Sequence, residues 1–374
     1  MKIIILKEKL KKGLNNIEKI TQKSLTLPIL NNVLLKVEKT FISLTTTNLE
    51  IGLRWWLLSK TEKEGEILIP ARLFSTLIGF LPDGPLELKT EGLFLNIKTG
   101  EYKSQIKGFN PGEFPLFPQI SQEEKITLNN QTFCQALSQI IDFTSPSLTR
   151  PEISGIFFQF QKDQIKIVAT DSFRLGEKKI FSKLPLTKEY SFILPQLTAK
   201  EVVNIFSDSE GDLKIYFSPN QVLFESMFSE TNHPQIHLIS RLIEGEFPDY
   251  QAIIPKKYET RGIFSKNEFL NQIKSASLFS GKISEVKLNI FSQKGKIEIS
   301  SQNPELGEYK SSLPGKIKGK DLSISFNHRF LVEGLLKIKT PEVVFELTSP
   351  DDPAVLKPVG AEDFLYVIMP IKTS

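Results

Sequence analysis

The sequence has very little of the residues on which most catalytic and metal sites depend: one cysteine, three histidines and two tryptophans in 374 residues. The single cysteine, Cys134, excludes a disulfide within the chain and is typical of a protein that works in a reducing compartment. The sequence also contains no glycine-rich phosphate loop, nucleophile elbow or zinc-ligand spacing. We therefore predict a cytoplasmic protein that is not an enzyme and uses no cofactor and no metal ion.

Long apolar runs are also missing. The first residues, 1–7, hold too short an apolar stretch for a secretory signal. The most apolar later stretch, residues 364–371, is far shorter than the roughly 18 residues of a membrane helix. We expect no association with a membrane.

The few candidate reactive side chains have simpler explanations. His233 and His237 have the i, i+4 spacing of helical metal ligands, but Pro234 between them argues against a helix. Asp351 and Asp352 lie between two prolines and are typical turn formers. Cys134 falls on the apolar side of a predicted helix, where a buried, inert thiol is expected.

The charge is mildly basic, with a net charge of +4 and a pI near 8.8. Predicted helices keep basic residues off their apolar stripes: Lys9, Lys11, Lys12, Arg72, Lys200, Lys266, Lys274, Arg329 and Lys337. This pattern fits ordinary solvated faces, and it also fits helices that share a polyanion as their partner. No aromatic residues are interleaved there, so contact with a nucleic-acid backbone is favoured over base stacking.

The chain repeats itself about every 130 residues. Two acid-Phe-Pro connectors, at residues 113–115 and 246–248, each close a strand-like region and divide the sequence into thirds. Thr47 to Thr170 is 123 residues, Pro70 to Pro195 is 125, Pro195 to Asn327 is 132, and Phe114 to Phe247 is 133. A period this long indicates tandem domains, because solenoid repeats span only about 20–50 residues.

Each third predicts the same α+β unit of two helices packed against antiparallel strands. In the first third, a strand at residues 2–6 precedes a helix whose apolar face carries Leu10, Leu14 and Ile17. A second strand ends near Pro70, which is placed in the first turn of the second helix. We set the domain boundaries at 1–120, 121–255 and 256–374.

The end of the chain predicts a binding surface. Residues 364–371 are apolar almost to the terminus, and Pro370 cannot continue a strand ladder. An apolar segment that leaves a sheet edge can form one wall of a peptide groove, although a last core strand explains it equally simply.

Several motifs, in order along the whole chain, carry a family resemblance: residues 26–30 (Thr-Leu-Pro-Ile-Leu), 169–175 (Ala-Thr-Asp-Ser-Phe-Arg-Leu), 245–250 (Gly-Glu-Phe-Pro-Asp-Tyr), Phe326-Asn327 and 366–371 (Tyr-Val-Ile-Met-Pro-Ile). With these motifs the chain resembles the bacterial DNA polymerase III beta subunit, the sliding clamp. The resemblance implies a head-to-tail homodimer, a ring of six domains with helices lining a hole for double-stranded DNA.

The resemblance also implies a pocket, between the second and third domains, for linear motifs of the replicative polymerase alpha subunit, the clamp loader, repair polymerases and mismatch-repair proteins. Carried over by position, its residues are Ile153, Thr170, Ser172, Phe173, Arg174, Leu175, Pro248, Ile253, Asn327, Phe330, Pro353, Val367, Ile368, Met369, Pro370 and Ile371. The family often has Gly-His where this chain has Ser172-Phe173, and some members have a basic residue where it has Ala252. These departures concern motif preference.

For DNA, the resemblance implies contacts at Lys23, Ser24, Arg72, Arg150 and Lys200. For the dimer, it implies that the strand at 101–108 pairs with residues 305–312 of the other chain, with Ile106 and Leu278 as apolar contacts. The alternative is a peptide-binding adaptor of the same fold that does not encircle DNA.

Overall fold

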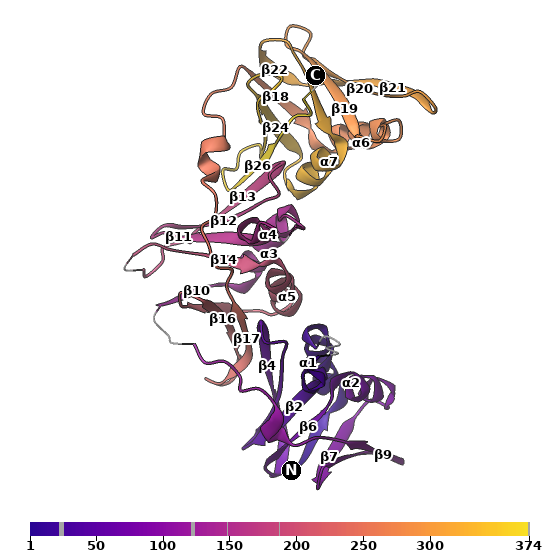
Figure 1. The fold of residues 1–374 in the computed structure, drawn as a ribbon, viewed down its shortest axis with the longest axis vertical. Helices are drawn as coiled ribbons and strands as arrows, with labels where there is room; N and C mark the ends of the chain where they lie inside the picture. The colour runs from indigo at the N-terminus through magenta and orange to yellow at the C-terminus, as the bar shows by residue number, and fades with distance from the viewer. Residues whose placement is uncertain (22–25, 121–123, 148, 187, 373–374) are drawn as a thin grey trace. The chain divides into compact units, whose positions relative to one another are not determined.

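The structure, a computed structural model, describes residues 1–21, 26–120, 124–147, 149–186 and 188–372 (Figure 1). Contacts divide these residues into two compact units. Unit 1 contains residues 1–135 and 197–242, and unit 2 contains residues 136–196 and 243–374.

The described chain passes three times through one order of elements. The first pass is β1 (Lys2–Leu6), α1 (Lys7–Ile20), β2 (Asn32–Glu38), β3 (Phe41–Thr47), β4 (Ile51–Leu58), β5 (Lys60–Lys63), β6 (Gly65–Pro70), α2 (Ala71–Phe80), β7 (Pro85–Glu91), β8 (Phe94–Thr99) and β9 (Tyr102–Lys107). The second is β10 (Glu124–Asn129), α3 (Asn130–Ile140), α4 (Pro151–Ser154), β11 (Gly155–Phe160), β12 (Gln164–Thr170), β13 (Arg174–Phe181), β14 (Tyr190–Pro195), α5 (Gln196–Phe206), β15 (Asp212–Phe217), β16 (Gln221–Met227) and β17 (Pro234–Arg241). The third is β18 (Thr260–Ser265), α6 (Lys266–Ser277), β19 (Glu285–Phe291), β20 (Lys296–Asn303), β21 (Gly307–Pro314), β22 (Lys316–Gly319), β23 (Leu322–Asn327), α7 (His328–Lys337), β24 (Glu342–Leu347), β25 (Ala354–Pro358) and β26 (Phe364–Ile368).

The spacing of the second helices confirms the predicted period. Ala71, which begins α2, and Gln196, which begins α5, are 125 residues apart, and α7 begins 132 residues later at His328. The predicted α+β class is also confirmed, because each pass packs two long helices on antiparallel strands.

The described strands of unit 1 form two sheets. One has the order β5-β1-β7-β8-β9, and the other has the order β10-β15-β16-β17-β4-β3-β2-β6. In the second sheet, β17 pairs antiparallel with β4, from Ile236 opposite Trp55 to Ser240 opposite Ile51. Strands of the first and second repeats therefore share one sheet.

The described strands of unit 2 repeat this arrangement. One sheet runs β14-β11-β12-β13-β26-β25-β24-β18-β22, and the other runs β21-β20-β19-β23. Here β13 and β26, which lie side by side in Figure 1, join the second repeat to the third, from Arg174 opposite Ile368 to Lys178 opposite Phe364.

Local sequence explains the elements. The predicted apolar face of α1 is buried through Leu10, Leu14 and Ile17. Gly13 on the same helix allows a close approach, because an added Cβ would lie 2.9 Å from the Leu44 side chain. Pro70 ends β6 and serves as the N-cap of α2, one residue before the first helical turn in which the sequence analysis placed it. None of the described helices is long and apolar enough to cross a bilayer.

Gly334 on α7 generates a prediction about packing in unit 2. The Tyr366 ring of β26 lies directly against Gly334, and its hydroxyl donates to the Phe330 oxygen at 2.9 Å. A methyl group at Gly334 would overlap that buried ring, so we expect Gly334→Ala to lower the unfolding free energy by about 1–3 kcal/mol. Urea denaturation followed by circular dichroism measures the change.

Gly79→Ala on α2 is the matched control, since an added Cβ there meets no atom within 4 Å. This substitution should leave stability unchanged or raise it by up to about 1 kcal/mol through helix propensity. Equal midpoints for the two variants would contradict the packing argument.

Candidate functional site

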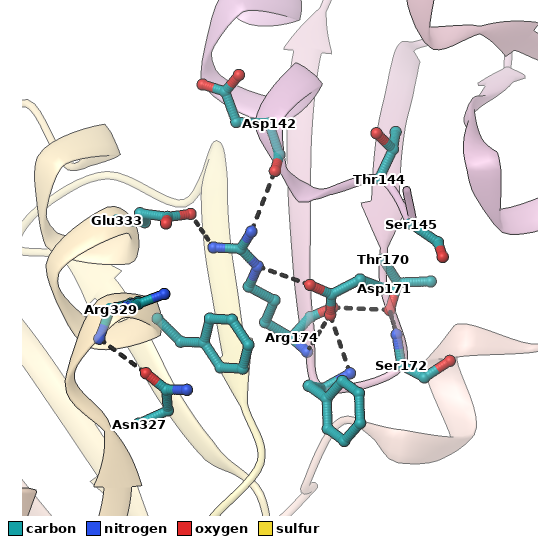
Figure 2. A network of polar contacts seen from close by, with 12 residues as sticks. Asp142, Thr144, Ser145, Thr170, Asp171, Ser172, Arg174, Asn327, Arg329 and Glu333 are labelled. Carbon is teal, nitrogen blue, oxygen red and sulfur yellow. Dashed lines mark hydrogen bonds and ion pairs between the residues drawn. The ribbon is translucent and has the colours of Figure 1, made fainter. Parts of the chain in front are cut away.

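The turn between β12 and β13 is held by its own side chains (Figure 2). The Thr170 hydroxyl donates to the Arg174 oxygen at 2.7 Å and accepts from the Ser172 amide at 3.1 Å. The Asp171 Oδ1 accepts from the amides of Phe173 and Arg174, both at 3.0 Å. Ser172 has a φ of +77°, a region that non-glycine residues rarely adopt, and the surrounding hydrogen bonds compensate for this strain.

The Arg174 side chain links this turn to two other segments of unit 2 (Figure 2). Its Nε donates to Asp171 Oδ2 at 2.9 Å, its Nη2 donates to the Asp142 main-chain oxygen at 3.2 Å, and its Nη1 pairs with Glu333 on α7. Burial is the largest single influence and lowers the pKa of the Arg174 guanidinium, but the hydrogen bond that it donates to Glu333 and the charges of Asp171 and Glu333 together outweigh burial and raise that pKa. The guanidinium is therefore a fixed cation at the junction of the second and third repeats.

Aromatic rings complete the surroundings of Arg174. The guanidinium carbon lies 4.7 Å from the centre of the Phe330 ring and 5.4 Å from that of Phe143. The Phe173 ring is nearly parallel to Phe330, with 6.4 Å between centroids. Arg174 and the rings thus form one surface with an apolar outer layer and a buried charge beneath.

The C-terminal segment forms the neighbouring wall. After β26 ends at Ile368, the Met369 amide donates to the Phe173 oxygen at 2.9 Å, and the Ile371 amide donates to Ser325 at 2.8 Å. Pro370 between them has no amide hydrogen to pair. The segment therefore leaves the sheet after Ile368, as Pro370 predicted, but it does so from an inner strand and stays attached to the turn, which the sequence did not predict.

A small core supports these surfaces. It contains Val168, Leu175, Tyr250, Val355 and Val367. The Tyr250 hydroxyl donates to Glu177 Oε2 at 2.6 Å. Burial and the hydrogen bond with the Glu177 side chain both raise the pKa of Tyr250, so the phenol stays neutral and acts as the donor. The core fixes the floor beneath the turn.

The surface above this floor offers apolar side chains to a partner. Phe173 is 62% exposed and Ile253 is 45% exposed. Other residues of the predicted pocket are half-buried: Pro248, Phe330, Pro353, Met369, Pro370 and Ile371. Such a surface, with exposed and half-buried apolar groups around a fixed cation, is suited to receive apolar side chains of a short peptide.

The predicted pocket residues lie at different depths in unit 2. Ile153, Leu175, Val367 and Ile368 are buried, and Leu175 and Val367 belong to the supporting core. The turn and the C-terminal segment supply the surface. Asn327 caps α7, since its side chain accepts from the Arg329 amide at 3.0 Å, and it thereby sets where Phe330 lies. We refer to the turn at 170–174, Phe330 and the segment 369–371 as the unit 2 site.

The predicted DNA contacts lie in different settings. Arg72 and Lys200 are exposed on α2 and α5. The Arg150 guanidinium donates to Glu152 Oε1 at 3.0 Å and to the Ser172 hydroxyl at 3.3 Å, so it borders the unit 2 site. Lys23 and Ser24 lie outside the described residues.

The two predicted apolar dimer contacts also differ. Ile106 on β9 is only 3% exposed, because it packs within its own sheet, whereas Leu278 after α6 is 71% exposed. In the described sheets, β9 and β21 are both edge strands, as the predicted pairing requires of each chain.

Sequence reasoning did not assign Asp142, Phe143, Asp171 or Glu333 to the site. Asp171 lies inside the quoted turn motif, and an Asp two or three residues before main-chain amides is itself a turn signal. The other three approach Arg174 from distant parts of unit 2, and no local pattern marks them.

The described residues contain no cluster of three or more His, Cys, Asp or Glu that could hold a metal ion. His237 lies on strand β17 and its Nε2 contacts Glu225 at 2.7 Å. Cys134 is buried, and burial raises the pKa of its thiol to about 12. Because little of the Cys134 side chain is present as the thiolate, this thiol is unreactive.

Repeated α+β domains joined through shared antiparallel sheets define the class of tandem-domain scaffolds. Three family models cover almost the whole chain: the N-terminal domain of the DNA polymerase III beta subunit at 1–118, its central domain at 127–249 and its C-terminal domain at 251–372. The chain belongs to the DNA polymerase III beta subunit family.

Relatives and solved structures agree with this assignment. The beta sliding clamps of Staphylococcus aureus (strain N315) and Staphylococcus epidermidis (strain RP62A) are each 29% identical over 370 residues, which is 96% of both chains. The crystal structures of the Bacillus subtilis DNA polymerase sliding clamp and the Streptococcus pyogenes beta subunit match 100% of each chain, with a TM-score of 0.93 and 26% identity. These matches confirm the predicted clamp fold and family.

Asp171 generates a prediction about the turn. Its carboxylate accepts hydrogen bonds from two main-chain amides and from the Arg174 side chain, and the carboxylate is largely buried. We expect Asp171→Ala to lower the unfolding free energy by about 2 kcal/mol, because these donors lose their acceptor. Asp171→Asn keeps an oxygen that accepts from the two amides, so it should lower the unfolding free energy clearly less. Chemical denaturation checks the order, which an equal loss in both variants would contradict.

Proposed function

We propose that two copies of this chain close head to tail into a ring around double-stranded DNA, and that the unit 2 site tethers the replicative DNA polymerase. The ring acts by topology, without catalysis, and serves chromosomal DNA in the cytoplasm of a bacterial cell. The clamp loader, repair polymerases and mismatch-repair proteins are expected partners through short motifs.

One observation gives the main support for the proposed ring. Strands β9, β17 and β26 occupy the same place, as the third strand after the second helix of each repeat, and β4, β13 and β21 are each the third strand after the first helix. Two such pairs are already joined within the chain, β17 with β4 and β26 with β13. The equivalent pair, β9 with β21, remains as two edges of the described sheets.

The two proposed edges carry opposite net charge. Lys103 and Lys107 on β9 outnumber Glu101, and Glu305 and Glu308 at β21 outnumber Lys310, all of them exposed. Because the same chain carries both edges, two copies satisfy both edges at once. A head-to-tail contact between two copies then closes the ring instead of extending it into a filament.

The charge on the helices supports a DNA partner. On the described long helices, exposed basic residues outnumber exposed acidic ones by eight to two: Lys9, Lys11, Lys12, Lys19, Arg72, Lys200, Lys274 and Arg329 against Glu8 and Glu268. The whole chain is only +4, so cationic charge concentrates on the helices. Such charge attracts any phosphate backbone without reading sequence.

Charge exchange tests the dimer edges. Lys103→Glu/Lys107→Glu makes both edges acidic, and Glu305→Lys/Glu308→Lys makes both edges basic. We expect each variant to dimerise at least about tenfold more weakly than the parent chain, since like charges then face each other. An equimolar mixture should restore the dimer, because each edge again meets its opposite charge. Light scattering across a dilution series measures this; persistent dimers of either variant alone would refute the proposed edges.

Topology tests the ring. We expect the protein, once loaded by a clamp loader onto nicked circular DNA, to stay bound in gel filtration and to leave when the circle is cut. It should bind short linear duplex weakly at physiological salt, because a ring slides off the ends. Retention on cut DNA would contradict topological binding, and a chain that stays monomeric would favour the adaptor function.

Deletion tests the unit 2 site. Removal of residues 369–374 takes away the C-terminal wall, and we expect loss of measurable binding to a polymerase motif peptide while the dimer remains. Removal of residues 372–374 alone keeps Met369, Pro370 and Ile371 and should preserve affinity within about twofold, because apolar burial carries the binding. Fluorescence anisotropy with labelled peptide gives both values. Full binding by the longer deletion would disprove the assignment.

A further inference from the structure

We propose that unit 1 carries a second peptide-binding site, built by the same elements as the unit 2 site but selective for a different motif. A cavity of about 210 Å³ lies there, at the β3–β4 turn and the end of β17. The occupant we infer is a short peptide segment with an aliphatic side chain next to an acidic one. The argument rests on the proposed role of the unit 2 site as a peptide site.

The turn that borders the cavity copies the turn of the unit 2 site. The Thr47 hydroxyl donates to the Ile51 oxygen at 2.9 Å and accepts from the Leu49 amide at 3.0 Å. Asn48 Oδ1 accepts from the amides of Glu50 and Ile51 at 3.0 and 2.7 Å, as Asp171 does for its own turn. Leu49 has a φ of +75°, within two degrees of the angle at Ser172.

The neighbouring strand also corresponds. Ser240 on β17 lies opposite Ile51, as Ile368 on β26 lies opposite Arg174. The next amide, of Arg241, donates to the Glu50 oxygen at 2.9 Å, and the matching amide of Met369 donates to Phe173 at the same distance. The strand end therefore approaches both turns in one geometry.

The acid-Phe-Pro connector and the core beneath the cavity also resemble those of the unit 2 site. Pro115 lines the cavity and holds the place in its acid-Phe-Pro unit that Pro248 holds in the other. Under the cavity, Leu223 and Ile239 pack with Phe117. Their counterparts by position under the unit 2 site are Val355, Val367 and Tyr250. Both floors are thus built from equivalent residues.

Three exchanges change the chemistry of the surface. At the positions of Phe173, Arg174 and Met369, unit 1 carries Glu50, Ile51 and Arg241. The unit 1 cavity therefore replaces an aromatic ring and a thioether with two opposite charges and replaces the fixed cation with an aliphatic side chain. A motif of apolar residues that suits the unit 2 site therefore meets a different surface in unit 1.

The exposed Arg241 sets the charge of the occupant. Neither Arg241 nor Glu50 forms an ion pair within the described residues, although both line the cavity. A guanidinium binds a carboxylate through two parallel hydrogen bonds, which favours an acidic residue beside Arg241. Glu50 is the neighbour of Arg241, because its main-chain oxygen accepts from the Arg241 amide at 2.9 Å, and its carboxylate disfavours a second acidic residue in the occupant.

The apolar part of the cavity determines the second property of the peptide, an aliphatic side chain. Leu116, Pro115 and Pro118 line it on one side, and Leu116 is 94% exposed. An exposed leucine of this kind loses water contact when a partner covers it. The volume is similar to that of cavities of about 150 Å³ that accept benzene, so one leucine-sized side chain fits.

Nuclear magnetic resonance of isoleucine methyl groups in the full-length chain tests the proposal. Ile51 and Ile239 line the unit 1 cavity, and Ile368 and Ile371 belong to the predicted unit 2 pocket. The probe is the synthetic peptide acetyl-Gly-Ser-Leu-Asp-Leu-Gly-Ser-amide, compared with versions that carry Asn or Lys in place of Asp. We expect the chemical shifts of the Ile51 and Ile239 methyl groups to change saturably with peptide concentration. The fitted affinity should be highest for the Asp peptide.

Two substitutions of exposed side chains sharpen the test. Arg241→Gln should weaken the Asp peptide about tenfold and make the Asp and Asn peptides equal, because the charged hydrogen bonds are lost. Phe173→Ala, at the equivalent of Glu50, is the matched control and should leave the shifts at Ile51 and Ile239 unchanged. No shift at Ile51 and Ile239 up to 10 mM peptide (on the order of the weakest binding of interest), or equal affinity for all three peptides, overturns the proposal.

The same spectra separate the two sites. A polymerase motif peptide should shift Ile368 and Ile371 but not Ile51 and Ile239. If it shifts neither pair while the Asp peptide still shifts the unit 1 pair, the proposed function of the unit 2 site fails and the unit 1 site stands. Shifts of Ile51 and Ile239 that follow protein concentration without peptide would assign the cavity to contacts between copies and would overturn a peptide site.

Discussion

Antiparallel strand pairing between repeats is the interaction on which the rest of the structure depends. Within unit 1, β17 adds to the edge at β4, and within unit 2, β26 adds to the edge at β13. Sheet edges present main-chain donors and acceptors that must be paired or protected. By joining at their edges, the repeats turn this liability into their main connection, and they leave one strand of each kind, β9 and β21, at the edges of the described sheets.

The same pairing builds the binding surfaces. At each junction, the end of one repeat's last strand meets the turn that precedes the partner strand, and a hydrogen bond of 2.9 Å fastens the chain as it leaves the sheet, from Met369 to Phe173 and from Arg241 to Glu50. The connectors contribute at both junctions, because Pro115 and Pro118 line the unit 1 cavity and Tyr250 packs with Leu175 in unit 2. The junctions therefore create a site geometry, and the side chains placed on it decide which partner fits.

Arg174 shows how one side chain distinguishes the two junctions. It reaches Asp171, the Asp142 oxygen and Glu333, and it carries the rings of Phe143 and Phe330 on its faces. Such a partly buried ionic network favours one arrangement of the elements more than it adds stability, since desolvation offsets much of the attraction. Ile51 at the equivalent place makes no such network, and the unit 1 junction relies on Phe117, Leu223 and Ile239 instead.

The sequence by itself determined the period and many of the helices and strands of each repeat. Apolar periodicity placed β1 at Lys2–Leu6 and the buried face of α1, because these patterns depend on residues close in the chain. The motif resemblance named the family and, within unit 2, residues that the fold does bring together around Phe173, Phe330 and Met369.

Only the tertiary structure decided which strands pair between repeats, since main-chain hydrogen bonds are alike for every residue and no local pattern names a partner. For this reason β17, which contains Pro234 and His237, was not foreseen as a strand that extends the sheet at β4. The partners of Arg174 at Glu333, 159 residues away, and the burial of Ile106 follow from long-range packing. The likeness of the two junctions appears only in their hydrogen bonds and angles, because exchanges such as Phe173 for Glu50 conceal it in the sequence.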